Sequence, residues 1–173
     1  MRIFLVGYMA AGKTSVGKRL STSLGMAFED LDSYIEATEE CTINDIFKRE
    51  GEAGFRGIER RCLRQLIETQ DQVIVATGGG TPCFYDNLAY MKECGLVVYL
   101  KHDVSSLVFR LRNDSAARPL IAELSEQELE HFVHHHLEER REYYEDADLI
   151  INAMGMSDRK IENLADEIAR YSR

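Results

Sequence analysis

The chain has 173 residues, a net charge of −9 and a pI of about 5.1, values typical of one soluble globular domain over residues 1–173. This acidity argues against a surface for nucleic acid or anionic membrane, and no apolar run reaches membrane-spanning length. Its four cysteines form no C-x-x-C pair and no signal-like segment opens the chain, so we expect a cytoplasmic protein with reduced thiols, and a monomer.

The first predicted strand is residues 2–6, and it is followed directly by "GYMAAGKTS". This string fits G-x-x-x-x-G-K-[ST] from Gly7 to Thr14, a pattern in which glycines let backbone N–H groups surround a phosphate. A helix is expected to begin near Lys13 and to stop at Gly25, and its free N–H groups add to the anion site. The side chain of Lys13 would reach the β- and γ-phosphates, and the Thr14 hydroxyl would bind Mg²⁺. The residues expected to contact the nucleotide here are Ala10, Ala11, Gly12, Lys13, Thr14 and Ser15.

The second predicted strand, residues 26–30, ends in "EDLD". On extended backbone, Asp30 and Asp32 would point to the same side. Beside a phosphate loop, one carboxylate can serve Mg²⁺ through water while the other orients an attacking hydroxyl and takes its proton. The alternative is a solvated turn whose carboxylates cap a helix.

A long helical region follows, and it carries Arg56 in "FRGIER". Thr42 is a predicted N-cap, and from Glu52 an apolar stripe recurs at helical spacing, formed by Phe55, Ile58, Cys62 and Leu66. An arginine on a helix is usually solvated, but Arg56 becomes a candidate ligand if the substrate has a carboxylate, which arginine binds bidentately.

The third predicted strand, residues 72–77, leads into Gly78, Gly79 and Gly80. Three glycines lose much conformational entropy on folding, and they permit backbone N–H groups to approach a ligand closely. The alternative is a flexible turn.

After a fourth predicted strand at 96–100, the segment "RNDSAARPLI" predicts a mobile lid at about 112–122. Pro119 favours extended backbone at Arg118, which would bring one cation over the nucleotide. The alternative is an ordinary surface loop.

The next helix is predicted to start with a capping box at Ser125. In "HFVHHH" (131–136) the histidine spacing could bind a metal, but no partner ligands stand at zinc-site spacing, so a solvated helix face is favoured. "EERREYY" supplies Arg140 and Arg141, and a fifth strand at 148–152 precedes a last helix capped by Ser157.

Strands alternating with helices in this way predict an α/β three-layer sandwich with a parallel sheet. Ligands of such sheets gather at the carboxyl ends of the strands. The phosphate loop, "EDLD" and "GGGTP" (78–82) are therefore expected to meet in space.

In their order and spacing, these pieces resemble the shikimate kinase family along nearly the whole chain: "GYMAAGKTSVG", "FEDLD…IE", "FRGIE", "GGG", "RPLI" and a late Arg-Tyr stretch. The resemblance implies a P-loop, nucleoside-monophosphate-kinase-like fold with a five-stranded sheet in the order 2-3-1-4-5. It implies transfer of the ATP γ-phosphoryl to the 3-hydroxyl of shikimate with Mg²⁺, a step of chorismate and aromatic amino-acid biosynthesis. An acceptor-binding region would span about 31–62.

On the nucleotide side, Lys13 resembles the family's catalytic lysine, and Thr14 and Asp30 resemble its Mg²⁺ ligands. Arg118 resembles the catalytic arginine of the lid. The family arginine that stacks on adenine falls near Arg112, although the lid is one residue out of step there.

On the acceptor side, Asp32 resembles the catalytic carboxylate that holds the shikimate hydroxyls. Arg56 and Gly79 resemble shikimate ligands, with Gly78 and Gly80 beside them. A second carboxylate-binding arginine falls at Arg140 or Arg141, and Arg140 is preferred because it lies four residues before Tyr144.

Two departures and several alternatives accompany this hypothesis. Ala10 stands where the family usually has a glycine, and a methyl group is tolerable there only at negative φ; the lid also lacks a second basic residue between Asn113 and Arg118. A kinase for another small acceptor, such as gluconate or a nucleoside monophosphate, remains open. A GTP-dependent switch would need N-K-x-D and D-x-x-G strings, which are absent, and the intact Lys13 and Asp32 argue against a non-catalytic homologue.

Overall fold

A computed structural model describes residues 1–113 and 124–171 of the chain. All five predicted strands are confirmed within one residue at each end. The elements are β1 (Arg2–Val6), α1 (Lys13–Leu24), β2 (Ala27–Asp30), α2 (Leu31–Glu39), α3 (Ile43–Thr69), β3 (Val73–Ala76), the 3₁₀ turn η1 (Thr81–Cys83), α4 (Asn87–Cys94), β4 (Leu96–Lys101), α5 (Val104–Asn113), α6 (Glu126–Glu145), β5 (Leu149–Asn152) and α7 (Asp158–Tyr171).

The strands form one parallel sheet in the order β2-β3-β1-β4-β5, which confirms the order implied by the family resemblance. Its central strand, β1, places Phe4 opposite Val75 of β3 on one side and opposite Val97 of β4 on the other. All three side chains are fully buried. A strand covered on both faces must be apolar throughout, which explains why "RIFLV" shows no alternation.

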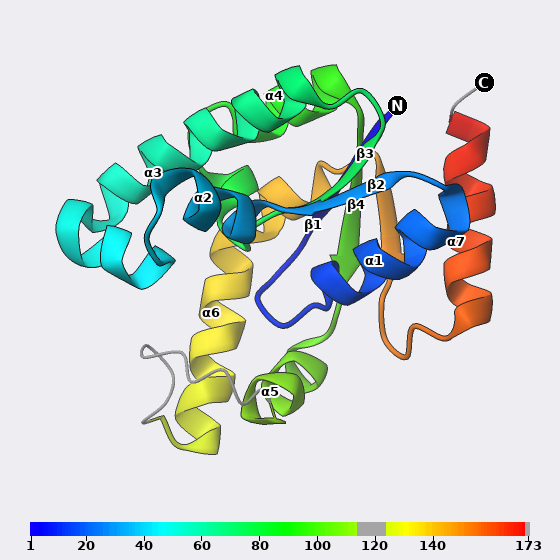
Figure 1. The fold of residues 1–173 in the computed structure, drawn as a ribbon. Coiled ribbons are helices and arrows are strands. Elements are labelled where there is room, and N and C mark those ends of the chain that lie inside the picture. The colour runs from blue at the N-terminus through cyan, green and yellow to red at the C-terminus, as the bar shows by residue number, and fades with distance from the viewer. Residues whose placement is uncertain (114–123, 172–173) are drawn as a thin grey trace.

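Helices cover the two faces of the sheet (Figure 1). α1 and α7 pack side by side on one face, while α3, α4 and α6 lie toward the other. Right-handed crossovers explain this arrangement. The crossover from β1 to β2 through α1 runs one way along the sheet, and those through α3, α4 and α6 run the other way, so they cover opposite faces. None of the helices in residues 1–113 and 124–171 is long and apolar enough to cross a membrane.

The predicted helix boundaries follow from side-chain and backbone caps. Thr42 accepts a hydrogen bond from the Asp45 N–H, and Ser125 forms a complete capping box with Glu128. The helices predicted from Thr42 and Glu52 join into α3 across a kink at Gly51, whose φ of 68° only glycine adopts readily.

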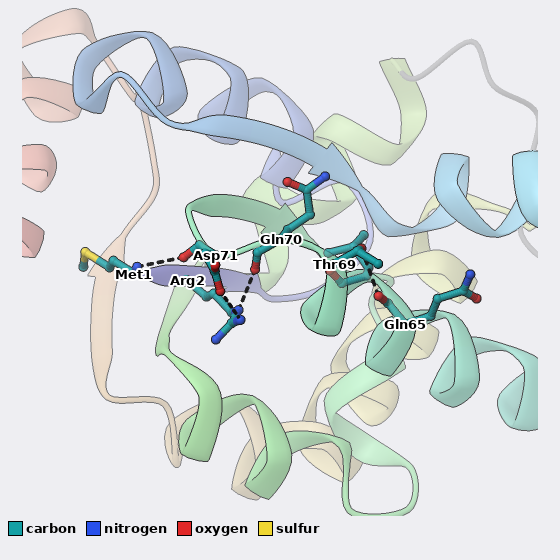
Figure 2. Close-up of polar contacts among 7 residues, drawn as sticks. Met1, Arg2, Gln65, Thr69, Gln70 and Asp71 are labelled. Carbon is teal, nitrogen blue, oxygen red and sulfur yellow. Dashed lines mark hydrogen bonds and ion pairs between the residues drawn. The ribbon is translucent and has the colours of Figure 1, made fainter.

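The amino-terminal edge of the sheet is fastened by exposed polar contacts (Figure 2). The terminal ammonium group of Met1 donates to the carbonyl of Asp71 at 2.8 Å. The guanidinium of Arg2 donates to the Gln70 carbonyl at 2.7 Å and to the Asp71 carboxylate at 2.9 Å. These contacts hold the start of β1 beside the turn that leads into β3.

Candidate active site

A cleft of about 890 Å³ opens at the carboxyl ends of the strands. The loop after β1 contributes Lys13 and Thr14, the end of β2 contributes Asp30 and Asp32, and the segment after β3 contributes residues 77–79. The expectation that these three stretches meet is confirmed. Their chemistry is therefore combined in one solvent-accessible space.

The side chain of Lys13, at the start of α1, folds back onto the preceding phosphate loop. Its side chain is only 9 % exposed, and Nζ donates to the carbonyls of Gly7 and Tyr8, both at 2.8 Å. The N-cap of α1 is Gly12, with φ of 85° and no side-chain cap. The start of α1 therefore presents the positive end of the helix dipole to an anion in the cleft, beside the ammonium group of Lys13.

Two further side chains hold the rest of this loop: His102, in the connection between β4 and α5, and Arg110 on α5. Arg110 Nε donates to the Ala10 carbonyl at 2.7 Å, and Nε2 of His102 lies 3.1 Å from the Ala11 carbonyl. Burial lowers the pKa of His102, so its ring is neutral near pH 7 and donates through Nε2. Side-chain donors of the protein therefore satisfy the loop carbonyls of Ala10 and Ala11.

Ala10 does not have the backbone that we expected. Its φ is +61°, whereas the sequence argument allowed a methyl group only at negative φ. Left-handed backbone costs a non-glycine residue roughly 1–2 kcal/mol because Cβ crowds the carbonyl oxygen. The hydrogen bond from Arg110 to the Ala10 carbonyl helps to hold this strained conformation.

The expectation that Asp30 and Asp32 share extended backbone is wrong, because Asp32 lies in the first turn of α2. Asp30 is the N-cap of that helix, and its Oδ1 accepts from the N–H groups of Asp32 and Ser33 at 3.1 and 3.4 Å. Its Oδ2 accepts from the Thr14 hydroxyl at 2.7 Å. Both carboxylates still line the cleft, and helix capping and a site role coexist at Asp30.

The glycine turn after β3, residues 78–80, leaves no room for larger side chains at Gly78 and Gly80. A Cβ at Gly80 would lie 2.5 Å from Nη2 of Arg56, and one at Gly78 would lie 2.9 Å from Glu59 and 3.2 Å from Asp32. None of the three has a positive φ. Glycine is therefore needed at Gly78 and Gly80 because charged side chains pack against the turn, and not because the turn is flexible.

Arg56 is buried beside Gly80 and is not among the described residues that line the cleft. It is 8 % exposed, its Nη1 donates to Glu59 at 2.9 Å, and its guanidinium lies 4.2 Å from the ring centre of Phe84. Glu59 is fully buried and also accepts from the Thr81 hydroxyl at 2.6 Å. Arg56 Nε is a buried donor that no described residue satisfies. The guanidinium is therefore fixed in orientation by Glu59, and its Nε is a buried polar atom that calls for an explanation.

Arg140 lies against the same glycine turn, and Arg141 does not. A Cβ at Gly79 would be 3.7 Å from Nη1 of Arg140, whereas Arg141 is exposed and pairs with Glu138. The Tyr144 hydroxyl donates to the Gly79 carbonyl at 2.6 Å. Burial raises the pKa of Tyr144, so this hydroxyl stays protonated and holds the turn.

The comparisons with known proteins agree with this geometry. The sequence model of the family described as "Shikimate kinase" matches residues 9–171. The chain belongs to the shikimate kinase family. A shikimate kinase from Azobacteroides pseudotrichonymphae genomovar. CFP2 is 43 % identical over 169 residues, which are 96 % of this chain and 99 % of the relative.

Solved structures of family members superpose closely. The shikimate kinase of Bacteroides thetaiotaomicron is 38 % identical with a TM-score of 0.90, and covers 99 % of this chain and 98 % of its own. That of Acinetobacter baumannii, in complex with shikimate, is 34 % identical with a TM-score of 0.83, and covers 99 % of this chain and 92 % of its own. A gluconokinase from Sinorhizobium meliloti 1021 is 16 % identical with a TM-score of 0.59, covers 98 % of this chain and 92 % of its own, and shares only the fold.

The two arginines of α5 lie in different places, and the one that lines the main cleft is not the Arg112 expected from the sequence. Arg112 is exposed and lines a separate pocket with Phe109, Glu126 and Glu130, whereas Arg110 lines the main cleft. Arg118 and nearly all of the expected lid at 112–122 lie outside the described residues.

The histidine stretch of α6 is divided. His131, His134 and His135 are exposed, as expected for a solvated helix, and the described residues contain no group of three or more His, Cys, Asp or Glu that could hold a metal. His136 is half-buried and lies 3.0 Å from the Tyr8 hydroxyl. The expectation of a solvated face is therefore wrong for this one histidine.

Sequence reasoning missed Glu59 and Arg110. Each stands beside other charged residues, "ERR" and "RLR", so neither composition nor spacing distinguishes it. For Glu59 the available signal was its i, i+3 spacing from Arg56, which places both on one face of a helix.

Proposed function

We propose that this chain transfers the γ-phosphoryl group of ATP to the 3-hydroxyl of shikimate, giving shikimate 3-phosphate and ADP, a step of chorismate and aromatic amino-acid biosynthesis. One observation carries the proposal beyond family membership. Asp32 lines the cleft and packs against Gly78, while the buried, pre-oriented Arg56 packs against Gly80 of the same glycine turn. A hydroxylated carboxylic acid matches an arginine and a carboxylate placed in this way.

The acceptor is bound at its acidic end by Arg56 and Arg140. Glu59 keeps the Arg56 fork in one orientation, so little side-chain entropy is lost on binding. Backbone groups of Gly78, Gly79 and Gly80 contact the acceptor from the turn. Asp32 orients the reacting hydroxyl toward the γ-phosphorus and accepts its proton.

The nucleotide is bound by the loop residues 10–15, with the phosphates over the first turn of α1. Lys13 leaves its two carbonyl partners to stabilise charge that develops on the β- and γ-phosphates. Arg110 is the arginine whose position suits a nucleotide contact, in preference to Arg112. Arg118 remains the proposed lid cation, with the lid at about 112–122.

Mg²⁺ fits the donors that are present. The Thr14 hydroxyl and Asp30 Oδ2 are adjacent hard oxygens that line the cleft, and such oxygens suit a small divalent cation that also keeps water and phosphate ligands. When bound there, the ion neutralises phosphate charge.

We further propose a single kinase domain over 1–173, with acceptor binding at about 31–62, acting as a cytoplasmic monomer without nucleic-acid partners. The net charge of −9 supports the last point, since nucleic-acid binding requires a basic surface.

The test is ADP release by the purified chain with ATP, Mg²⁺ and either shikimate, gluconate or no acceptor. We expect turnover with shikimate at least about 100-fold above both other reactions, because only shikimate would align its hydroxyl while its carboxylate is held. A Lys13→Ala chain measures contaminating kinases. Equal turnover with gluconate, or none with shikimate, would overturn the proposal.

A further inference from the structure

Tyr8 is an unusual component of the phosphate loop because its large side chain is 1 % exposed. Its hydroxyl lies 3.0 Å from Nδ1 of His136 on α6, a hydrogen-bonding distance. The two rings meet edge to face, with centroids 5.6 Å apart and planes at 87°. Phe132, one turn earlier on α6, also packs against the imidazole, with ring centroids 5.2 Å apart.

This contact joins the two halves of the site. The Tyr8 carbonyl is one of the two acceptors that hold Lys13 Nζ, so displacement of Tyr8 displaces the lysine. Arg140 follows His136 by one helical turn, and its guanidinium carbon lies 6.0 Å from the centre of the Tyr8 ring. Tyr8 is therefore part of the phosphate loop and also contacts α6, the helix that carries Arg140.

We propose that His136 is a positioning residue for phosphoryl transfer: its neutral imidazole accepts a hydrogen bond from the Tyr8 hydroxyl and keeps Lys13 in register with Arg140. The role rests on the proposed function, because it assigns the two cations to the two substrates of one reaction. Transfer between substrates held by different elements depends on their separation, and errors of about 1 Å lower rates severely.

The charges around His136 favour the neutral ring that this role requires. Burial, and then the charge of Arg140, lower the pKa of His136 below its ordinary value. The other groups that act on it are His135 and Glu139 on α6 and Glu52 on α3, and the two carboxylates oppose the shift. Above the depressed pKa, the neutral ring with its proton on Nε2 accepts at Nδ1, and this bond is lost as the pH falls through the pKa.

A double-mutant cycle tests the role. Tyr8→Phe and His136→Leu each remove the same hydrogen bond, so each should lower kcat/KM for shikimate about three- to tenfold. The double variant should be no worse than the poorer single variant, because the shared bond is lost only once. His136→Asn should recover most activity, since its side-chain oxygen can accept near the position of Nδ1. His134→Asn, an exposed neighbour on α6, is the matched control and should match the unmodified chain.

Imidazole ¹⁵N shifts followed against pH give a second readout that needs no turnover. Tyr8→Phe removes a donor that favours the neutral ring, so the pKa of His136 should rise toward 6.5. Additive losses in the cycle, or an unchanged pKa in folded Tyr8→Phe, would overturn the role of His136. An unmodified chain without shikimate turnover would instead overturn the proposed function, even if the ¹⁵N titration confirmed the hydrogen bond.

Discussion

The two edges of the sheet are built from the same strands but by opposite means. At the amino-terminal edge, Arg2 and Asp71 pair at the surface, with side-chain exposures of 23 % and 98 %. At the carboxyl edge, Arg56 and Glu59 pair with side-chain exposures of 10 % and 0 %. The first pair joins the start of β1 to the turn before β3, whereas the second holds a guanidinium group against the glycine turn that borders the cleft.

The difference shows which edge of the sheet carries features that lower the stability of the fold. Buried ion pairs return little net stability because desolvation offsets their attraction, and Ala10 adds a strained backbone at the same edge. Nothing of this kind occurs among Met1, Arg2, Gln70 and Asp71. Costly features concentrated at one edge are expected of a binding site, since pre-oriented charge is useful only where a ligand meets it.

The largest expected effect is at Lys13. Lys13→Ala removes the cation nearest the β- and γ-phosphates, so turnover should fall about 100-fold or more. Lys18→Ala, an exposed lysine on the same helix, should leave turnover unchanged. Steady-state ADP release and circular dichroism would check both, and near-normal turnover by folded Lys13→Ala would remove this lysine from catalysis.

The glycine turn comes next. Gly80→Ala would force Arg56 away from Glu59, because the new Cβ would lie 2.5 Å from Nη2. We expect KM for shikimate to rise about tenfold, equivalent to roughly 1.4 kcal/mol, with little change in KM for ATP. Gly57→Ala on α3 is the control, since its Cβ would meet no atom within 4 Å. Equal kinetics of the two variants would refute the packing argument.

Strain at Ala10 predicts a smaller effect with the opposite sign. Ala10→Gly removes the left-handed penalty but increases the entropy of the unfolded chain, so the free energy of unfolding should rise by about 0.5–1 kcal/mol. Denaturant titration with an unchanged m-value would measure it. A loss of stability would mean that the loop does not hold φ near +61° in solution.

The smallest effect should be at the amino-terminal edge. Asp71→Ala removes an exposed ion pair, and such pairs contribute little, so the melting temperature should stay within about 2 °C. Shikimate kinetics should not change. A melting temperature lowered by 5 °C or more would show that the contacts of Asp71 contribute far more stability than a surface ion pair does.

The strands and the phosphate loop could be predicted because their signals are local. Apolar runs such as residues 2–6 can only be buried, and the glycine–lysine spacing from Gly7 encodes a loop directly. The sheet order came from the family resemblance, since no local signal distinguishes which strand lies beside β1.

The rest depends on contacts between distant segments. The burial of Glu59 requires Arg56 and Thr81 together, and the choice of Arg110 over Arg112 depends on how α5 is rotated against the Ala10 carbonyl. Asp32 falls on a helix because Asp30, the last residue of β2, is also the N-cap of α2, so the helix begins at the residue after the strand.

The central claim is that the carboxyl edge presents Arg56 to the acid group of the acceptor. Arg56→Lys tests it most directly, because the ammonium group still compensates buried Glu59 but loses the bidentate fork. Arg60→Lys, an exposed arginine on the same helix that pairs with Asp86, is the control. The measurement is KM for shikimate and for ATP in both variants. We predict that Arg56→Lys raises KM for shikimate at least about tenfold and leaves KM for ATP within about twofold, whereas Arg60→Lys changes neither. An unaltered KM for shikimate in a folded Arg56→Lys chain would contradict the account.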